Sequence, residues 1–346
     1  MMVAALAALA SGPARSEAIH RGRVLQFPRD HGAHPDTRTE WWYATGFLGT
    51  FEAPTHGFQV TFFRSRTGLA EDSRSLSRFV PRQLLFAHAA LTDLGARTHH
   101  HADRIARWSG DGQATLAVAA VHDAHICIGR WQLRHDNGTW QALIDDPALS
   151  LQLTMQRTQP ILLQGDAGFS RKGPEERQAS HYLSEPQLAT TSPLGSGRAW
   201  LDHEWSDEIL HPQAVGWDWV GFNLADDSAL TVFQLRRADG SALWAGGSWR
   251  PAGGSVRAFA PDEVTMTPGR LWASGGTGAR YPVEWALQTP AGRFTVRSLL
   301  DAQELDGRGS TGTVYWEGLS ELRDDAGRRV GLGYLELTGY AGRLRL

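Results

Sequence analysis

The stretch WYATGFLGTFEAPTHGFQVTFFR, residues 42–64, decides the fold class, because a second stretch further along the chain repeats its pattern. The second stretch is WVGFNLADDSALTVFQLR, residues 219–236. Both contain a Trp, a Gly-Phe pair, a turn, a Phe-Gln strand and a terminal Arg. Read as an internal repeat, the two stretches predict two similar β-domains in tandem.

The rest of the chain also favours strands. Short apolar or alternating runs are bounded by turn signals such as HDNG, RADG, TPAG and DDAG, and long amphipathic helices are absent from the pattern. Many short strands at regular spacing predict an all-β fold, and the repeat predicts two consecutive antiparallel β-barrel domains. The clearest further strands are expected at residues 56–66, 84–94, 114–121, 229–237 and 293–300.

Composition limits the function classes. The chain has 346 residues, of which 41% are hydrophobic and 21% charged, and its formal net charge is −3. This length suits two domains, and the near-neutral charge makes nucleic acid an unlikely partner. A single cysteine, Cys127, excludes an intrachain disulfide and a cysteine-based metal cluster. The single lysine, Lys172, lies in the polar run SRKGPEERQ, which predicts a loop and argues against Schiff-base catalysis.

The expected domain limits follow from composition. Residues 165–197 are rich in Gly, Pro and Ser and lack strand periodicity, so they are the natural crossing between the domains. We therefore expect a signal-like or flexible N-terminus at 1–24, a first barrel at 25–190 and a second at 191–346. The apolar run MMVAALAALA, residues 1–10, ends in small residues as an export signal does. A periplasmic or secreted protein, soluble after signal removal, is the expectation.

Two clusters of acids and indoles carry the candidate chemistry. Around EWWY, strand alternation places Glu40 and Trp42 on one side and Trp41 and Tyr43 on the other. The run AWLDHEWSDEILHPQAVGWDW, residues 199–219, contains the second cluster. Here Asp202 and Glu204 share a face with Trp200, whereas His203 and Trp205 share the opposite face. A carboxyl group beside aromatic carbon keeps its proton more readily, because burial disfavours the charged form.

Other interpretations of these clusters compete with catalysis. Glu40 could pair with an arginine such as Arg38 in a core strand, which would make its role structural. Paired carboxylates beside aromatic residues also occur in glycosidases. The histidines of residues 31–34 and 99–101 lie in loop-like sequence without a matching third ligand position, so we expect no metal and no other cofactor.

Several motifs together give a family resemblance. They are HPDTRTEWWYATG, FQVTFFR, FAHAALTD, GDAGFSRKG, AWLDHEW, GWDW with FQLR, and YWEGLSEL with GYLELTGY. From about Phe27 to Gly342 the chain resembles the lipocalin-like family of carotenoid 1,2-hydratases, of the hydroxyneurosporene synthase type, and AttH-like secreted proteins. This resemblance implies two consecutive lipocalin-like β-barrels that enclose apolar cavities, in agreement with the repeat.

The resemblance also implies a reaction and a site. Hydratases of this kind are thought to use a His-x-Trp pair and a Tyr-x-Asp pair, and His203-Glu204-Trp205 matches the first. Tyr315-Trp316-Glu317 and Tyr334-Leu335-Glu336 have the alternation of the second but lie further on. We expect catalytic roles for Asp202, His203, Glu204, Trp205 and Asp218, and cavity or ligand-binding roles for Glu40, Trp42, Tyr43, Trp217, Trp219, Tyr315 and Glu317.

Two functions therefore stay open at the level of sequence. The first is acid-catalysed addition of water to a carbon–carbon double bond of a hydrophobic polyene or prenyl substrate. The alternative is a non-catalytic periplasmic carrier of a lipid-like ligand, associated with an ABC transporter as some AttH-like proteins are. Both functions imply a hydrophobic small-molecule ligand.

Overall fold

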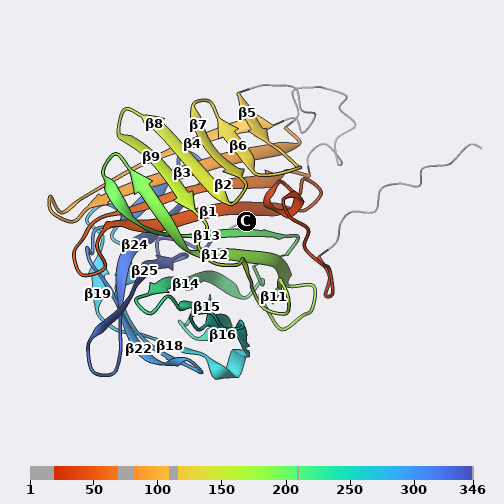
Figure 1. The fold of residues 1–346 in the computed structure, drawn as a ribbon. Coiled ribbons are helices and arrows are strands. Elements are labelled where there is room, and N and C mark those ends of the chain that lie inside the picture. Colours follow the sequence, from red (N-terminus) through yellow and green to blue (C-terminus); the bar gives the residue numbers. More distant parts are fainter. Residues whose placement is uncertain (1–18, 69–80, 109–115, 209, 345–346) are drawn as a thin grey trace, which may run out of the picture.

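The protein consists of two antiparallel, barrel-like β-sheets that lie against each other (Figure 1). The computed structural model describes residues 19–68, 81–108, 116–208 and 210–344. The export signal expected at Met1–Ala10 lies outside these residues, as do the first residues of the strand expected at 114–121. Within the described residues the helices are two short 3₁₀ turns, η1 (Arg29–His31) and η2 (Pro261–Glu263). Neither of them has the length or apolar character that crossing a membrane would require.

The first sheet is nearly closed into a barrel, because its terminal strands β4 and β5 approach each other. β10 (Leu162–Leu163) and β11 (Phe169–Arg171) pair with β12 beside the main path. Along that path the order is β4 (Thr98–Trp108), β3 (Gln83–Asp93), β2 (Pro54–Arg66), β1 (Thr39–Gly49), β13 (Gly195–Ser206), β12 (Ala179–Ser192), β9 (Leu149–Gln156), β8 (Thr139–Asp146), β7 (Trp131–Asp136), β6 (His125–Ile128) and β5 (Ala117–Ala119).

The second sheet repeats the arrangement of the first. The two repeated stretches form the hairpins β1–β2 in one sheet and β14–β15 in the other, and each holds a central place in its sheet. The order is β17 (Arg257–Phe259), β16 (Ala242–Arg250), β15 (Ala229–Arg237), β14 (Ala214–Leu224), β25 (Arg329–Leu337), β24 (Thr313–Arg323), β22 (Gly292–Ser298), β21 (Glu284–Thr289) and β18 (Thr265–Pro268), and β23 (Glu304–Gly307) pairs with β24. A separate two-stranded sheet joins β19 (Leu271–Ala273) to β20 (Arg280–Pro282).

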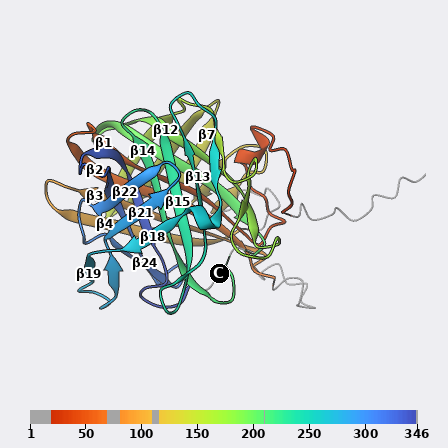
Figure 2. The same ribbon diagram turned by 90° about the horizontal axis from the view of Figure 1, so that it is seen from below.

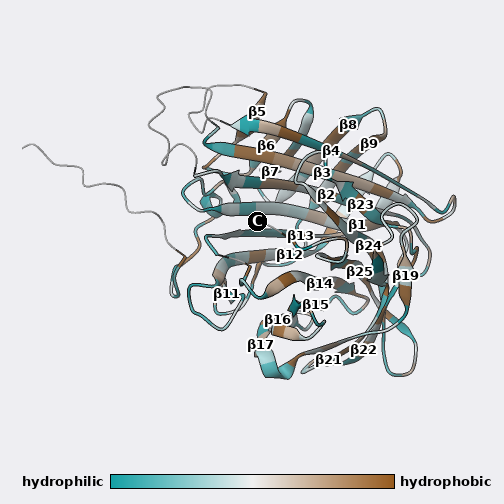
Figure 3. Ribbon diagram, turned by 180° about the vertical axis from the view of Figure 1, so that it is seen from behind, coloured by the Kyte–Doolittle hydropathy of each residue, from teal (hydrophilic) through white to brown (hydrophobic). Residues whose placement is uncertain are grey.

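Apolar side chains gather in three main places. One core fills the first barrel and includes Trp42, and another fills the curve of the second sheet and includes Trp316. The third lies between the sheets and joins Tyr43 of β1 to Trp219 of β14. Hydrophobic and hydrophilic residues are mixed along the strands of both sheets (Figure 3), as expected where alternate side chains face different surroundings. The third core positions the candidate site.

The chain passes from the first sheet to the second later than the domain boundary at 190/191 expected from sequence. β12 and β13 form a hairpin within the first sheet, and the chain reaches the second sheet only between Ser206 and Ala214. Viewed from below, β14 lies alongside β12 and β13 (Figure 2). The Gly- and Ser-rich residues 195–197, interpreted from sequence as part of a linker, are therefore strand residues. Their small side chains let neighbouring strands approach closely.

We expect Gly197→Ala to destabilise the fold, because a Cβ atom at this position would overlap the carbonyl oxygen of Phe47. Gly197 is opposite Leu48 in the β1–β13 ladder, so the backbone cannot shift without disturbing that pairing. Overpacking of this kind costs about 1–3 kcal/mol of unfolding free energy, which urea denaturation would measure. Gly275→Ala is a matched glycine control, since a Cβ atom there would have nothing within 4 Å. Equal stability of Gly197→Ala and the wild type would contradict the close approach.

Candidate active site between the two sheets

A cavity of about 110 Å³ lies between the sheets. Its walls come from β1, β2, β12 and β13 of the first sheet and from β14, β15, β24 and β25 of the second. A neighbouring cavity of about 170 Å³ shares Phe63, Trp217, Tyr315 and Glu336 with it, so the two adjoin. The main cavity has indole, phenol and phenyl walls, into which four carboxyl groups are set: Asp202, Glu204, Glu317 and Glu336.

As strand alternation predicts, the acids of β13 face one side of the strand and the residues between them face the other. Asp202 and Glu204 line the cavity. His203 and Trp205, on the opposite face, pack inside the first sheet, where the His203 ring stacks on Trp42 at a centroid distance of 4.8 Å. The two clusters predicted from sequence are also direct neighbours, because β1 pairs with β13 and places Tyr43 opposite Asp202. From the sequence repeat, the Glu40 and Asp202 clusters are expected to begin equivalent regions of the two barrels. This expectation is wrong, because both clusters lie in the first sheet.

Asp202 is a buried acid with three hydrogen-bond donors. Tyr182 Oη donates to Oδ2 at 2.7 Å, and Ser184 Oγ and Trp200 Nε1 donate to Oδ1 at 2.5 and 2.6 Å. These bonds favour the carboxylate, but burial outweighs them and raises the pKa of Asp202 to about 7. Near neutral pH this group can therefore either give or take a proton.

Glu317 and Glu336 form a pair of acids on adjacent strands. They are directly opposite each other in the β24–β25 ladder, a position in which two like charges are destabilising. Burial raises the pKa of Glu317 well above its usual range, and the charge of neighbouring Glu336 raises it further. Burial also raises the pKa of Glu336 to about 8, although Trp217 Nε1 donates to its Oε1 at 3.0 Å. Both groups are thus mainly protonated at neutral pH.

Glu317 is the acid best placed to donate a proton to a bound molecule. Its side chain is 2% exposed, and it lines the main cavity. Among the described residues its Oε1 atom has no hydrogen-bond partner at ordinary distance. A buried polar atom without a partner is costly, and a ligand in the cavity could supply that partner. Aromatic faces from Trp41, Trp217 and Trp219 line the same space.

Five predicted site residues lie outside this cavity. Trp42, His203 and Trp205 belong to packing in the first sheet, and Glu40 is completely buried there. Asp218 lies on the other face of β14, where Arg236 Nε and Gln234 Nε2 donate to its Oδ2 and Tyr340 Oη donates to its Oδ1. The seven that the structure does bring to the cavity are Tyr43, Asp202, Glu204, Trp217, Trp219, Tyr315 and Glu317.

Glu40 is the centre of a buried polar network. Its carboxylate accepts bonds from the His34 backbone N–H at 2.9 and 3.0 Å and from Arg64 Nε at 2.7 Å, and it contacts His34 Nδ1 at 2.7 Å and His203 Nε2 at 3.0 Å. Burial alone would raise the pKa of Glu40, but the charges of Arg64 and His34 and the histidine hydrogen bonds outweigh it and hold the pKa well below its usual range. The arginine partner is Arg64, not Arg38.

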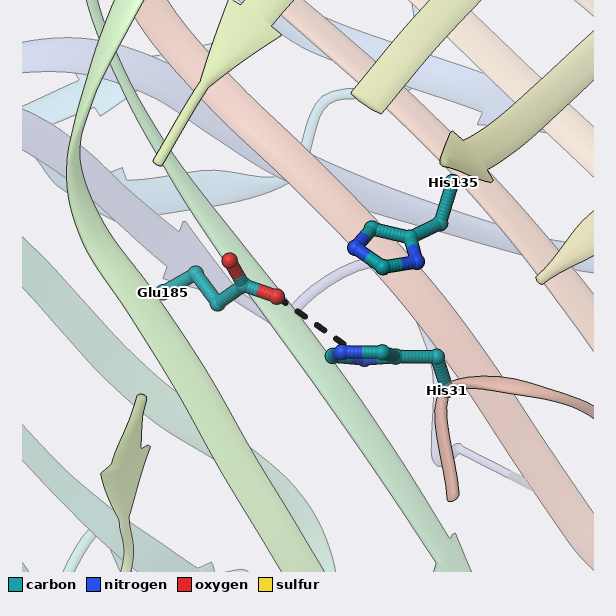
Figure 4. Close-up of side chains that lie close together, drawn as sticks. All are labelled: His31, His135 and Glu185. Atoms are coloured by element: carbon teal, nitrogen blue, oxygen red, sulfur yellow. Dashed lines mark ion pairs between the residues drawn. The ribbon is translucent and has the colours of Figure 1, made fainter. Parts of the chain in front are cut away.

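A second histidine cluster, His31, His135 and Glu185, has the composition of a metal site but not its charge distribution (Figure 4). His31 Nδ1 lies 3.8 Å from Glu185 Oε1. Arg157 donates to both oxygens of Glu185, and its Nη2 atom lies 3.2 Å from His31 Nε2 and 3.4 Å from His135 Nε2. A guanidinium therefore already supplies the positive charge at this cluster, and a metal ion would be repelled.

The sequence misses several cavity residues. Trp41, Lys172, Tyr182, Phe233 and Glu336 all line the cavity. Glu336 belongs to the second Tyr-x-acid pair, and only its distance in sequence from His203 kept it out of the predicted site. Tyr182 comes from the segment interpreted as a linker. Lys172 could not be found from its polar neighbours, because the burial of its side chain depends on the second sheet.

Comparison with known proteins agrees with this architecture. The sequence matches the AttH-like family over residues 18–340. A crystal structure of a protein assigned as AttH from Nitrosomonas europaea is 40% identical, with a TM-score of 0.82 over 93% of this chain and 99% of that one. The chain belongs to the AttH-like family. No curated protein sequence matches it.

More distant structures share the fold of this AttH-like chain. Kievitone hydratase from Nectria haematococca is 13% identical, with a TM-score of 0.67 over 92% of this chain and 94% of that one. CghA, solved with Sch210972, is 15% identical, with a TM-score of 0.56 over 93% and 95%. At these identities the likeness shows the lipocalin-like, two-sheet fold.

Proposed function

We propose that this AttH-like protein binds a hydrophobic small molecule between its sheets and adds water to one of its carbon–carbon double bonds by acid catalysis. The observation that carries the proposal is the pair Glu317–Glu336, two protonated carboxyl groups in an aromatic cavity. Raised carboxyl pKa values in a cavity are typical of general acids. The fold shared with kievitone hydratase supports the proposal without adding a substrate.

The chemistry balances with the groups that line the cavity. The O–H bond of Glu317 breaks as a C–H bond forms at one alkene carbon, which leaves a carbocation and a carboxylate. Indole faces stabilise the cation by about 2 kcal/mol or more when water is excluded. A water oxygen then forms the new C–O bond, and its released proton returns to the Glu317 carboxylate, directly or through Asp202. No oxidant, reductant or cofactor is needed for this sequence.

Labelling with heavy-oxygen water tests the reaction on many candidate substrates at once. The purified protein would be incubated in H₂¹⁸O with linear polyenes and prenylated compounds, and the products analysed by mass spectrometry. Hydration predicts one ¹⁸O atom and two hydrogens added per product molecule. Binding of these compounds without label would instead favour the carrier function, and a carotenoid or prenyl preference would appear as selective labelling.

We expect the rate of hydration to fall as pH rises through about 8. The reactive form carries a proton on both Glu317 and Glu336. The pKa of Glu336 is raised to about 8, and once Glu336 is ionised its charge makes Glu317 a weaker acid. Above that pH the rate should drop about tenfold per pH unit, because each unit lowers the protonated fraction tenfold. Initial rates between about pH 6 and 10, with circular dichroism to confirm folding, would measure this. A rate that rises across the same range would contradict an acid-limited reaction.

A further inference from the structure

The only lysine of the chain lies inside the cavity. Lys172 follows the end of β11, and its backbone N–H donates to Gln178 O at 2.7 Å, which closes a turn behind it. The residue is 5% exposed. Lys172 lies in a loop, as its polar neighbours predict, but its side chain is buried between the two sheets.

The ammonium group of Lys172 has unused hydrogen-bonding capacity. Its Nζ atom lies 2.9 Å from Glu204 Oε1 and forms one ion pair. It also lies 4.5 Å from the centroid of the Tyr182 ring and 4.3 Å from that of Phe233. An ammonium carries three N–H donors, and Glu204 is its only oxygen partner among the described residues. Two donors therefore face aromatic walls of the cavity.

From this geometry we propose that Lys172 binds the carbonyl oxygen of the ligand, so that the ligand class is an apolar prenyl or polyene ketone or a related uncharged carbonyl compound. This inference rests on the ligand cavity of the proposed function and adds its polar anchor. A carbonyl oxygen accepts from the free N–H donors without changing the charge of the site. The ion pair with Glu204 stays intact when it does so.

The charges of the cavity favour a neutral oxygen over a carboxylate. Glu204 already neutralises Lys172, and Ser180 Oγ also donates to Glu204. A carboxylate ligand would add an uncompensated negative charge near Asp202 and Glu204, in a space with aromatic walls. Burying an unpaired charge is far more costly than burying a hydrogen-bonded carbonyl group. A pure hydrocarbon, on the other hand, would leave two ammonium donors without acceptors.

Geranylacetone, a prenyl ketone, and the alkene of the same skeleton with CH₂ in place of C=O form a matched pair of probes. Binding would be followed by quenching of tryptophan fluorescence, since three indoles line the cavity. We expect the wild type to bind the ketone about ten- to a hundredfold more tightly than the alkene, because one hydrogen bond to a charged donor gives an affinity ratio of this size. The variant Lys172→Met/Glu204→Gln, which removes both charges together, should bind the two probes within about twofold of each other, because it lacks that bond.

A control variant and a second measurement accompany this binding test. Arg171→Met removes the neighbouring cation, which bonds to backbone oxygens of Gly173 and Pro174, and should keep the ketone preference. Labelling with [¹⁵Nζ]lysine gives a single side-chain resonance in the wild type, and it should shift with the ketone but not with the hydrocarbon. Equal affinities for the two probes, or an unmoved resonance, would overturn the inference. Ketone preference without ¹⁸O incorporation would overturn hydration alone.

Discussion

Replacement of Glu317 by Gln should abolish most water addition while leaving the fold intact. The amide is nearly isosteric but cannot donate an acidic proton, and general acid catalysis contributes about a hundredfold to ten-thousandfold in rate. Folding should suffer little, since the protein buries this carboxyl group in its protonated form and the amide keeps an oxygen that can accept a hydrogen bond from Tyr43.

The measurement is the initial rate of ¹⁸O incorporation, with ligand affinity measured in parallel. A lower rate at unchanged affinity would assign Glu317 to the transition state and not to ligand binding. Glu284→Gln is the matched control, because Glu284, on β21, makes a surface ion pair with Arg297. Its rate should equal that of the wild type. If Glu317→Gln incorporates label at the wild-type rate, another acid of the cavity donates the proton.

Replacement of Glu40 by Gln should have the largest effect on stability. Glu40 is fully buried, so Arg64 would keep its positive charge, and His34 its donors, without a carboxylate to receive them. Breaking a buried ion pair by removing one partner costs about 3–5 kcal/mol. Urea denaturation would measure the loss, and Glu263→Gln, which removes an exposed partner of Arg257, should change stability far less.

Low pH should lower the stability of the protein through the same network around Glu40. The pKa of Glu40 is held below its usual range in the folded protein, so its contribution to stability is present above the pKa of the unfolded chain, about 4.3, and is lost as pH falls toward the lower folded value. In Glu40→Gln this part of the acid destabilisation should be absent. A variant that stays as stable as the wild type but no longer adds water would show that Glu40 acts in function.

The local pattern of the sequence predicts part of this site well. Period-two alternation places Asp202 and Glu204 on one face of their strand and His203 on the other, because that period is a property of any extended strand. The same reasoning cannot say which strand lies next to which. It treats the clusters at Glu40 and Asp202 as counterparts in two barrels, whereas they are hydrogen-bonded neighbours in one sheet.

The remaining errors have the same physical origin. Strand pairing and burial depend on contacts between residues far apart in sequence. The polar neighbours of Lys172 correctly predict a loop but not the burial of its side chain. Gly197 is interpreted as a linker residue because strand patterns seldom contain glycine. Both make sense only beside their partners in space, which are the Tyr182 and Phe233 rings for the first and the backbone of Phe47 for the second.

The pairing of β1 with β13 has a consequence for synthesis and folding of the chain. Thr39 is opposite Ser206, so the first sheet cannot be completed until its last strand has left the ribosome. Until then, the edge of β1 that β13 will cover offers unpaired backbone groups to other chains. Contacts so distant in sequence slow folding and lengthen exposure to aggregation. A chain truncated at residue 190 should therefore collect in the insoluble fraction, whereas one truncated after residue 208 holds every strand of that sheet.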